Sequence, residues 1–244
     1  MPETFLILLC GGVMLAAALS DPRAVTLRWL RLAGIIAISM AALSMFFTAP
    51  RVNVWSVLAA AAVMTQLGFV QVAWRNTQRA MAGAAFALAV AAGTSLLLAI
   101  RPMNVPLLAI TCAFAAGVMG LALMDMLLGH AYLNAAEMTM APFMRLNLSL
   151  AAAMLGRAVL SIPVALFLLS RQQREMFWGI YGLYIGTRWF TGFLVSGVFV
   201  YMTHDCIKRR ATQSATGILY VADVMIFLGE MIGIYLISQT GLPL

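Results

Sequence analysis

Eight runs of mostly apolar residues divide the chain of 244 residues, and they constrain its fold more than any other feature. The hydrocarbon core of a bilayer is about 30 Å thick, so a helix needs about 20 largely apolar residues to cross it. Arg, Pro and Asn interrupt the sequence between the runs. The expected helices cover residues 5–19, 32–48, 54–74, 80–100, 105–129, 143–169, 176–202 and 213–237. The sequence therefore predicts an all-α fold, a polytopic integral membrane helix bundle.

The composition supports this prediction and excludes several other classes of protein. Hydrophobic residues make up 64% of the chain and charged residues 9%, whereas an ordinary soluble domain has about 25% charged residues. Such a chain has too little polar surface for a soluble fold, a disordered segment, a disulfide-stapled secreted domain or a nucleic-acid binder. We expect a single transmembrane domain over residues 1–244. The first run is short, so seven crossings, with this run partly in the interface, is the alternative.

The distribution of basic residues predicts which helix ends face the cytoplasm, because cationic loops tend to remain there. The connections after the first, third, fifth and seventh expected helices hold nine basic residues, and the other connections hold four. The first group is Arg23, Arg28, Arg31, Arg75, Arg79, Arg145, Lys208, Arg209 and Arg210, and the second is Arg51, Arg101, Arg171 and Arg174. This asymmetry predicts a bacterial inner-membrane protein with both termini on the outer side.

Ionisable residues inside the expected helices are the first candidates for function. A charged side chain at the centre of a bilayer costs about 2.5 kcal/mol or more, so each needs a partner or a purpose. All of these residues lie in the second half of the chain: Asp125, Arg157, Arg188, Asp223 and Glu230. Function is therefore expected in the fifth to eighth helices.

The depths of these residues predict which of them can meet. With a rise of about 1.5 Å per residue, Arg157, Arg188 and Glu230 fall in one layer of the membrane. Asp223 lies within one long side chain of that layer. Two interpretations remain open: ion bridges that hold the bundle together, helped by bidentate arginine geometry, or a polar cavity along a path for protons or substrate.

The two histidines form a second candidate site. His130 and His204 each end an odd-numbered expected helix, so both are expected at the basic face. Two neutral imidazoles at matched depth are what a bis-histidine b-type haem requires, with the haem iron between them. A mononuclear metal site with Asp125 or Asp205 is one alternative, and anchoring of helix ends at the interface is another.

Glycines along the seventh and eighth expected helices predict close packing there. Gly229 and Gly233 form a small-xxx-small pair, which allows two helix backbones to approach. The same glycines leave room for a planar quinone or porphyrin. Trp189 follows Arg188 directly and is expected to stack on its guanidinium.

These features favour one function and leave two others open. The favoured hypothesis is a membrane subunit of an electron-transfer or energy-converting complex, which binds haem b or quinone in its last four helices and uses the buried carboxylates for protons. Its expected partners are membrane lipids and other membrane-protein subunits. The alternatives are a small-solute or proton-coupled transporter or channel, and a structural or assembly subunit without chemistry of its own. No hydrolase, nucleotide-binding or retinal-binding motif occurs in the sequence, and whether the chain is an enzyme stays open.

Overall fold

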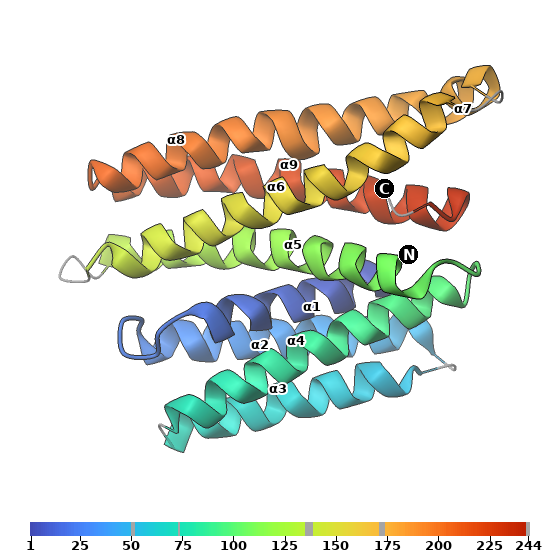
Figure 1. Cartoon of the computed structure of the whole chain (residues 1–244). Coiled ribbons are helices and arrows are strands. Elements are labelled where there is room, and N and C mark those ends of the chain that lie inside the picture. Colours follow the sequence, from blue (N-terminus) through green and yellow to red (C-terminus); the bar gives the residue numbers. More distant parts are fainter. Residues whose placement is uncertain (50–51, 73, 135–138, 171–173, 243–244) are drawn as a thin grey trace.

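Helices make up almost all of the chain in its computed structural model, which describes residues 1–49, 52–72, 74–134, 139–170 and 174–242 (Figure 1). No strand occurs within these ranges. The helices are α1 (Pro2–Leu19), α2 (Leu27–Thr48), α3 (Val54–Val72), α4 (Arg75–Leu98), α5 (Val105–Asn134), α6 (Ala141–Ser170), α7 (Arg174–Thr187), the π-helix η1 (Arg188–Val195), α8 (Ser196–Lys208) and α9 (Thr212–Thr240). The predicted all-α fold is confirmed.

In the part of the chain that the structure describes, the helices form eight rods, because α7, η1 and α8 follow one another without a break. Seven helices of these described ranges are long and apolar enough to cross a membrane, and α3 contributes a shorter apolar helix over Val54–Val70. The first helix is one of the seven, so its length does not confine it to the interface. Large apolar side chains cover the outside of the bundle, including Phe46 (74% exposed) and Leu183 (79% exposed). An apolar exterior of this extent suits lipid and not water, and the chain is an integral membrane protein.

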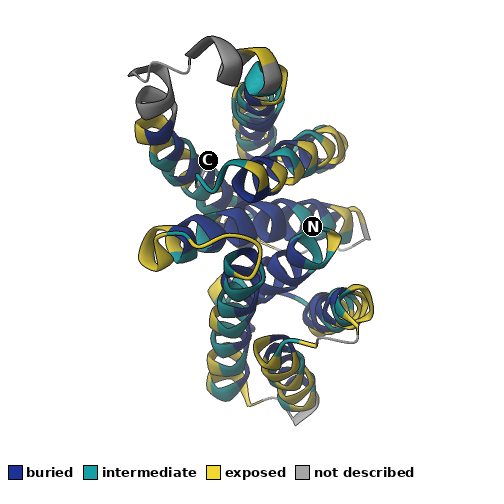
Figure 2. Cartoon of the chain, turned by 90° about the vertical axis from the view of Figure 1, so that its right-hand side faces the viewer, coloured by how far each residue is buried: buried dark blue, intermediate teal, exposed yellow. Residues whose placement is uncertain are grey.

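Helices α1 and α5 lie at the centre of the bundle. Helix α1 packs against α2, α4 and α5, while α5 also packs against α6 and α9. In the end-on view of Figure 2, buried residues gather in the middle and exposed residues on the outer helices. The two central helices approach closely at Gly12 and Gly120, where a Cβ atom on either residue would collide with the other helix's backbone.

The even number of rods brings both chain termini to one end of the bundle (Figure 1). At the opposite end, α1 leads into α2, α3 into α4, α5 into α6 and α8 into α9. These are the connections in which the sequence concentrates its basic residues. We refer to this end as the basic end.

Several helices extend beyond the apolar runs that predicted them. Helix α2 starts at Leu27 rather than at residue 32, and the Thr26 hydroxyl caps it by accepting a hydrogen bond from the Trp29 amide at 3.3 Å. Helix α5 continues past residue 129 to Asn134. Apolar runs mark the part of a helix inside hydrocarbon, whereas the interface allows charged side chains on further turns. The runs therefore predicted the number of helices better than their ends.

The close approach of the two central helices leads to a stability prediction. We expect Gly12→Ala to lower the free energy of unfolding by about 1–3 kcal/mol, because the new methyl group would overpack against the α5 backbone. Gly83→Ala on α4 is the matched control, since no atom lies within 4 Å of a Cβ placed there. Thermal unfolding of both variants in detergent measures the difference. Equal midpoints for the two variants would contradict the close packing.

Candidate functional site

A layer of three charged side chains connects three of the rods in the C-terminal half. Glu230 on α9 lies between Arg157 on α6 and Arg188 at the start of η1. Its Oε2 accepts hydrogen bonds from Nε and Nη2 of Arg157, both at 3.3 Å, and its Oε1 accepts one from Nη2 of Arg188 at 3.4 Å. The three side chains are 0%, 1% and 4% exposed for Arg157, Arg188 and Glu230. The structure thus brings together the three residues that depth had placed in one layer.

Arg188 is also held by backbone and ring contacts. Its Nη1 donates a hydrogen bond to the carbonyl oxygen of Gly229 at 2.8 Å. Its guanidinium lies over the ring of Phe193, 5.3 Å from the centroid. Trp189, the expected stacking partner, packs edge-on against Phe193 instead. A Cβ atom at Gly233 would collide with the Arg188 guanidinium, so this glycine provides the space in which the guanidinium lies.

Arg188 faces α9 from the first residue of the π-helix η1. Buried residues in this rod recur at intervals of four, at Arg188, Gly192 and Ser196. Residues four apart lie on nearly the same face of a helix, so these three share one face. Gly192 packs against Gly229, with a Cβ at Gly192 only 3.0 Å from the Gly229 Cα. The sequence predicted one helix over residues 176–202, but it did not predict that the segment from Arg188 to Val195 within it is π-helical.

Asp223 lies outside the charged layer, two turns before Glu230 on α9. The residue is 5% exposed, and neither carboxyl oxygen has a hydrogen-bond partner among the described residues. The expected balance of two cations by two anions is therefore not what the structure contains. One carboxylate, Glu230, contacts both guanidiniums.

Asp125 is buried near Asn147 of α6. The Asn147 amide Nδ2 donates a hydrogen bond to Oδ2 of Asp125 at 3.0 Å. Asp125 is 0% exposed and Asn147 1% exposed, and the Oδ1 atom of each has no partner within the described part of the chain. Sequence reasoning did not include Asn147, although an amide within an apolar run was a signal that could have identified it.

The two histidines lie on helices α5 and α8, which do not pack closely against each other. His130 is exposed near the end of α5, and His204 is partly buried near the end of α8. Helix α5 packs against α1, α4, α6 and α9, whereas α8 packs against α6, α9 and η1. Among the described residues, no group of three His, Cys, Asp or Glu side chains is arranged to hold a metal ion. Both helices end at the basic end (Figure 1), but they pack against different sets of helices.

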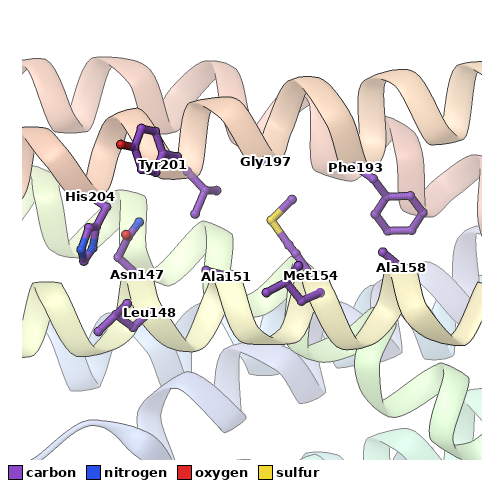
Figure 3. Close-up of a pocket in the computed structure, with 11 residues that line it drawn as sticks. Asn147, Leu148, Ala151, Met154, Ala158, Phe193, Gly197, Tyr201 and His204 are labelled. Carbon is purple, nitrogen blue, oxygen red and sulfur yellow. The ribbon is translucent and has the colours of Figure 1, made fainter.

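His204 instead lies at one end of a groove between α6 and α8. The groove has a volume of about 430 Å³, and Figure 3 shows its two walls and the side chains that line it. Its walls are mainly apolar and come from Leu148, Ala151, Met154, Leu155, Ala158, Phe193, Gly197 and Val200. Small residues occur on both walls, which leaves the space open. The groove extends from His204 to Phe193, the residue beneath Arg188.

The polar groups of the groove gather at its His204 end. Asn147 and His204 lie close to each other there, with Tyr201 beside them (Figure 3). The Nδ1 atom of His204 and the Oδ1 atom of Asn147 are buried and lack partners among the described residues. The residues that line the groove are therefore polar at its His204 end and apolar along the rest of its length.

Comparisons with known proteins found no similar protein. No protein-family profile matches the chain, and neither the curated proteins nor the solved structures contain a match. The fold and the site define a polytopic integral membrane protein with buried charges and a lined groove in its C-terminal half.

The charged layer leads to a second stability prediction. We expect Glu230→Gln to destabilise the fold by about 3–5 kcal/mol, because it removes the carboxylate to which two buried guanidiniums donate hydrogen bonds. Asp223→Asn, on the same helix, replaces a carboxyl group that has no described partner and should change stability far less. Thermal unfolding in detergent, followed by tryptophan fluorescence, compares the two variants. A larger loss for Asp223→Asn than for Glu230→Gln would refute the assignment.

Proposed function

We propose that the protein is a membrane subunit of an electron-transfer or energy-converting assembly, and that it binds a quinone in the groove between α6 and α8. The groove's division into one polar end and one long apolar part carries this proposal. A quinone has the same division, with ring oxygens at one end and an isoprenoid tail at the other. Ligand sites of this kind are typically apolar, with a few polar groups that fix orientation.

The polar end supplies the hydrogen bonds that a quinone head group needs. The Nδ1 atom of His204 would donate to a quinone carbonyl when it carries the ring proton, or accept from a quinol hydroxyl when it does not. The Oδ1 atom of Asn147 only accepts, so it would bind the hydroxyl of the quinol. Met154 and Phe193 would contact the ring or the first part of the tail, and a thioether adapts well to a flat ligand. The quinone would supply the redox chemistry, while these side chains hold and orient it.

The groove is also accessible from the lipid phase. Leu155 and Tyr201 on its rim are 68% and 74% exposed on the outer face of the bundle. A carrier that diffuses within the bilayer could therefore enter sideways, without passing through water. A redox centre must exchange electrons with the quinone, and we propose that another membrane-protein subunit carries it.

We further propose that the basic end faces the cytoplasm of a bacterial cell, with both termini on the outer side of the inner membrane. The concentration of Arg and Lys in the connections at this end supports that orientation. The polar end of the groove would then lie near the cytoplasmic interface.

We favour this function over a transporter that uses the charged layer as its substrate site. Glu230 already contacts both Arg157 and Arg188, and all three side chains are enclosed. A carboxylate held by two guanidiniums is better suited to connecting helices than to releasing a solute. We therefore interpret the charged layer as a structural element.

Photolabelling with an azido-quinone that carries an isoprenoid tail tests the proposal. We expect labelled peptides from α6 and α8. His204→Ala should weaken quinone binding by about two- to tenfold, the effect of losing one hydrogen bond. His130→Ala is the matched control, since this exposed histidine lies outside the groove residues.

A second pair of variants fills the groove directly. No atom lies within 4 Å of a Cβ at Gly197 or Gly217, but only Gly197 lines the groove. Gly197→Phe should abolish labelling, and Gly217→Phe on α9 should leave it unchanged. Labelling that survives Gly197→Phe, or labels confined to other helices, would contradict the proposed site.

A further inference from the structure

Two buried carboxyl groups near the groove have almost no hydrogen-bond donors. Asp125 is 0% exposed and Asp223 5% exposed. Of their four carboxyl oxygens, three have no partner among the described residues, and the fourth accepts only the Asn147 amide. An ionised carboxylate in an apolar interior is very costly unless donors or cations compensate it. Neither aspartate has a compensating cation as a hydrogen-bond partner.

The two carboxyl groups lie on neighbouring helices, because α5, which carries Asp125, packs against α9, which carries Asp223. Glu230, by contrast, contacts both Arg157 and Arg188. Among the described residues, one buried carboxylate thus has two cations, whereas these two carboxyl groups have no cation as a hydrogen-bond partner. A proton on each carboxyl group removes the cost of burying its charge.

Asn147 connects Asp125 to the groove. Its side chain is buried, donates Nδ2 to Asp125, and has an unpartnered Oδ1 atom. The same residue lines the groove beside His204 (Figure 3). A single side chain therefore separates the Asp125 carboxyl from the polar end of the groove.

We propose that Asp125 and Asp223 each bind a proton inside the membrane region, and that Asp125, which contacts the groove residue Asn147, exchanges its proton with the quinone bound at the His204 end. Reduction of a quinone to a quinol adds two electrons, which the redox centre of a partner subunit supplies, and two protons, one at each ring oxygen. One of these protons leaves the carboxyl group of Asp125, which becomes a carboxylate, and the other arrives from the basic end through His204. Oxidation of the quinol reverses both transfers. The exchange rests on the proposed function, whereas proton binding by the two aspartates does not.

Infrared spectroscopy of the quinone-free protein tests proton binding. We expect the carbonyl stretch of a protonated carboxyl group in a detergent without ester groups, with a downward shift in D2O. Asp125→Asn and Asp223→Asn should each reduce or displace this band, and the double variant should lose it. Asp205→Asn is the matched control, because this exposed aspartate pairs with Arg209 at 2.9 Å.

Either of two results would overturn proton binding by the two aspartates. One is the absence of the band from the unaltered protein, and the other is its persistence in the double variant, which would assign it to another group such as Glu230. Asn keeps the shape of Asp, and near-ultraviolet circular dichroism verifies the fold of each variant. If the double variant does not fold, the change in the carbonyl band of each single variant decides whether Asp125 and Asp223 carry the proton.

Addition of a quinone analogue tests the exchange. We expect the band to shift in the unaltered protein and to remain fixed in Gly197→Phe, whose groove is filled. A band that stays fixed in protein that photolabels normally would refute the exchange and leave the quinone site standing. A band without any photolabelling would refute the proposed function and leave proton binding by the two aspartates standing.

Discussion

The carboxylate of Glu230 between two guanidiniums is the interaction on which the C-terminal half depends. It joins α6, η1 and α9 inside the hydrocarbon region, where no water can replace a lost partner. Because all three side chains are enclosed, each rod can slide or rotate only by separating charges. This fixes the depth of α6 relative to η1, and therefore the two walls of the groove that begins next to Arg157 and Arg188.

The polar residues of the membrane region fall into two groups, which differ in whether their charges are compensated by hydrogen-bond partners. Arg157, Arg188 and Glu230 pair with one another and favour a fixed structure. Asp125 and Asp223 lie nearer the basic end and have few donors, which favours the binding and release of a proton. The groove runs alongside both groups, from His204 to Phe193. A rigid layer at one end and titratable groups at the other suit a ligand whose oxygens gain and lose protons.

Much of this was predictable from single residues, and some of it was not. The depth of Arg157, Arg188 and Glu230 followed from counting residues along straight helices, and their contact is confirmed. The same counting put Asp223 close to the layer but could not determine which way it faces around α9. It also put His130 and His204 at one end of the bundle, but it could not determine which helices are neighbours. Asn147 was not predicted, because a single amide in an apolar run marks a buried polar group but does not indicate its partner.

The sequence by itself determined that the chain is a membrane helix bundle, the number of its rods and the end at which its basic residues gather. These properties depend on the length and polarity of contiguous segments, because each segment must match the bilayer by itself. Only the tertiary structure decided the central positions of α1 and α5, the π-helical turn at Arg188, the helices that surround each histidine, and the groove. Those depend on which helices pack together and how each is rotated. Packing in lipid is driven by close contact and buried polar pairs, and a small-xxx-small pattern within one helix does not determine which helix packs against it.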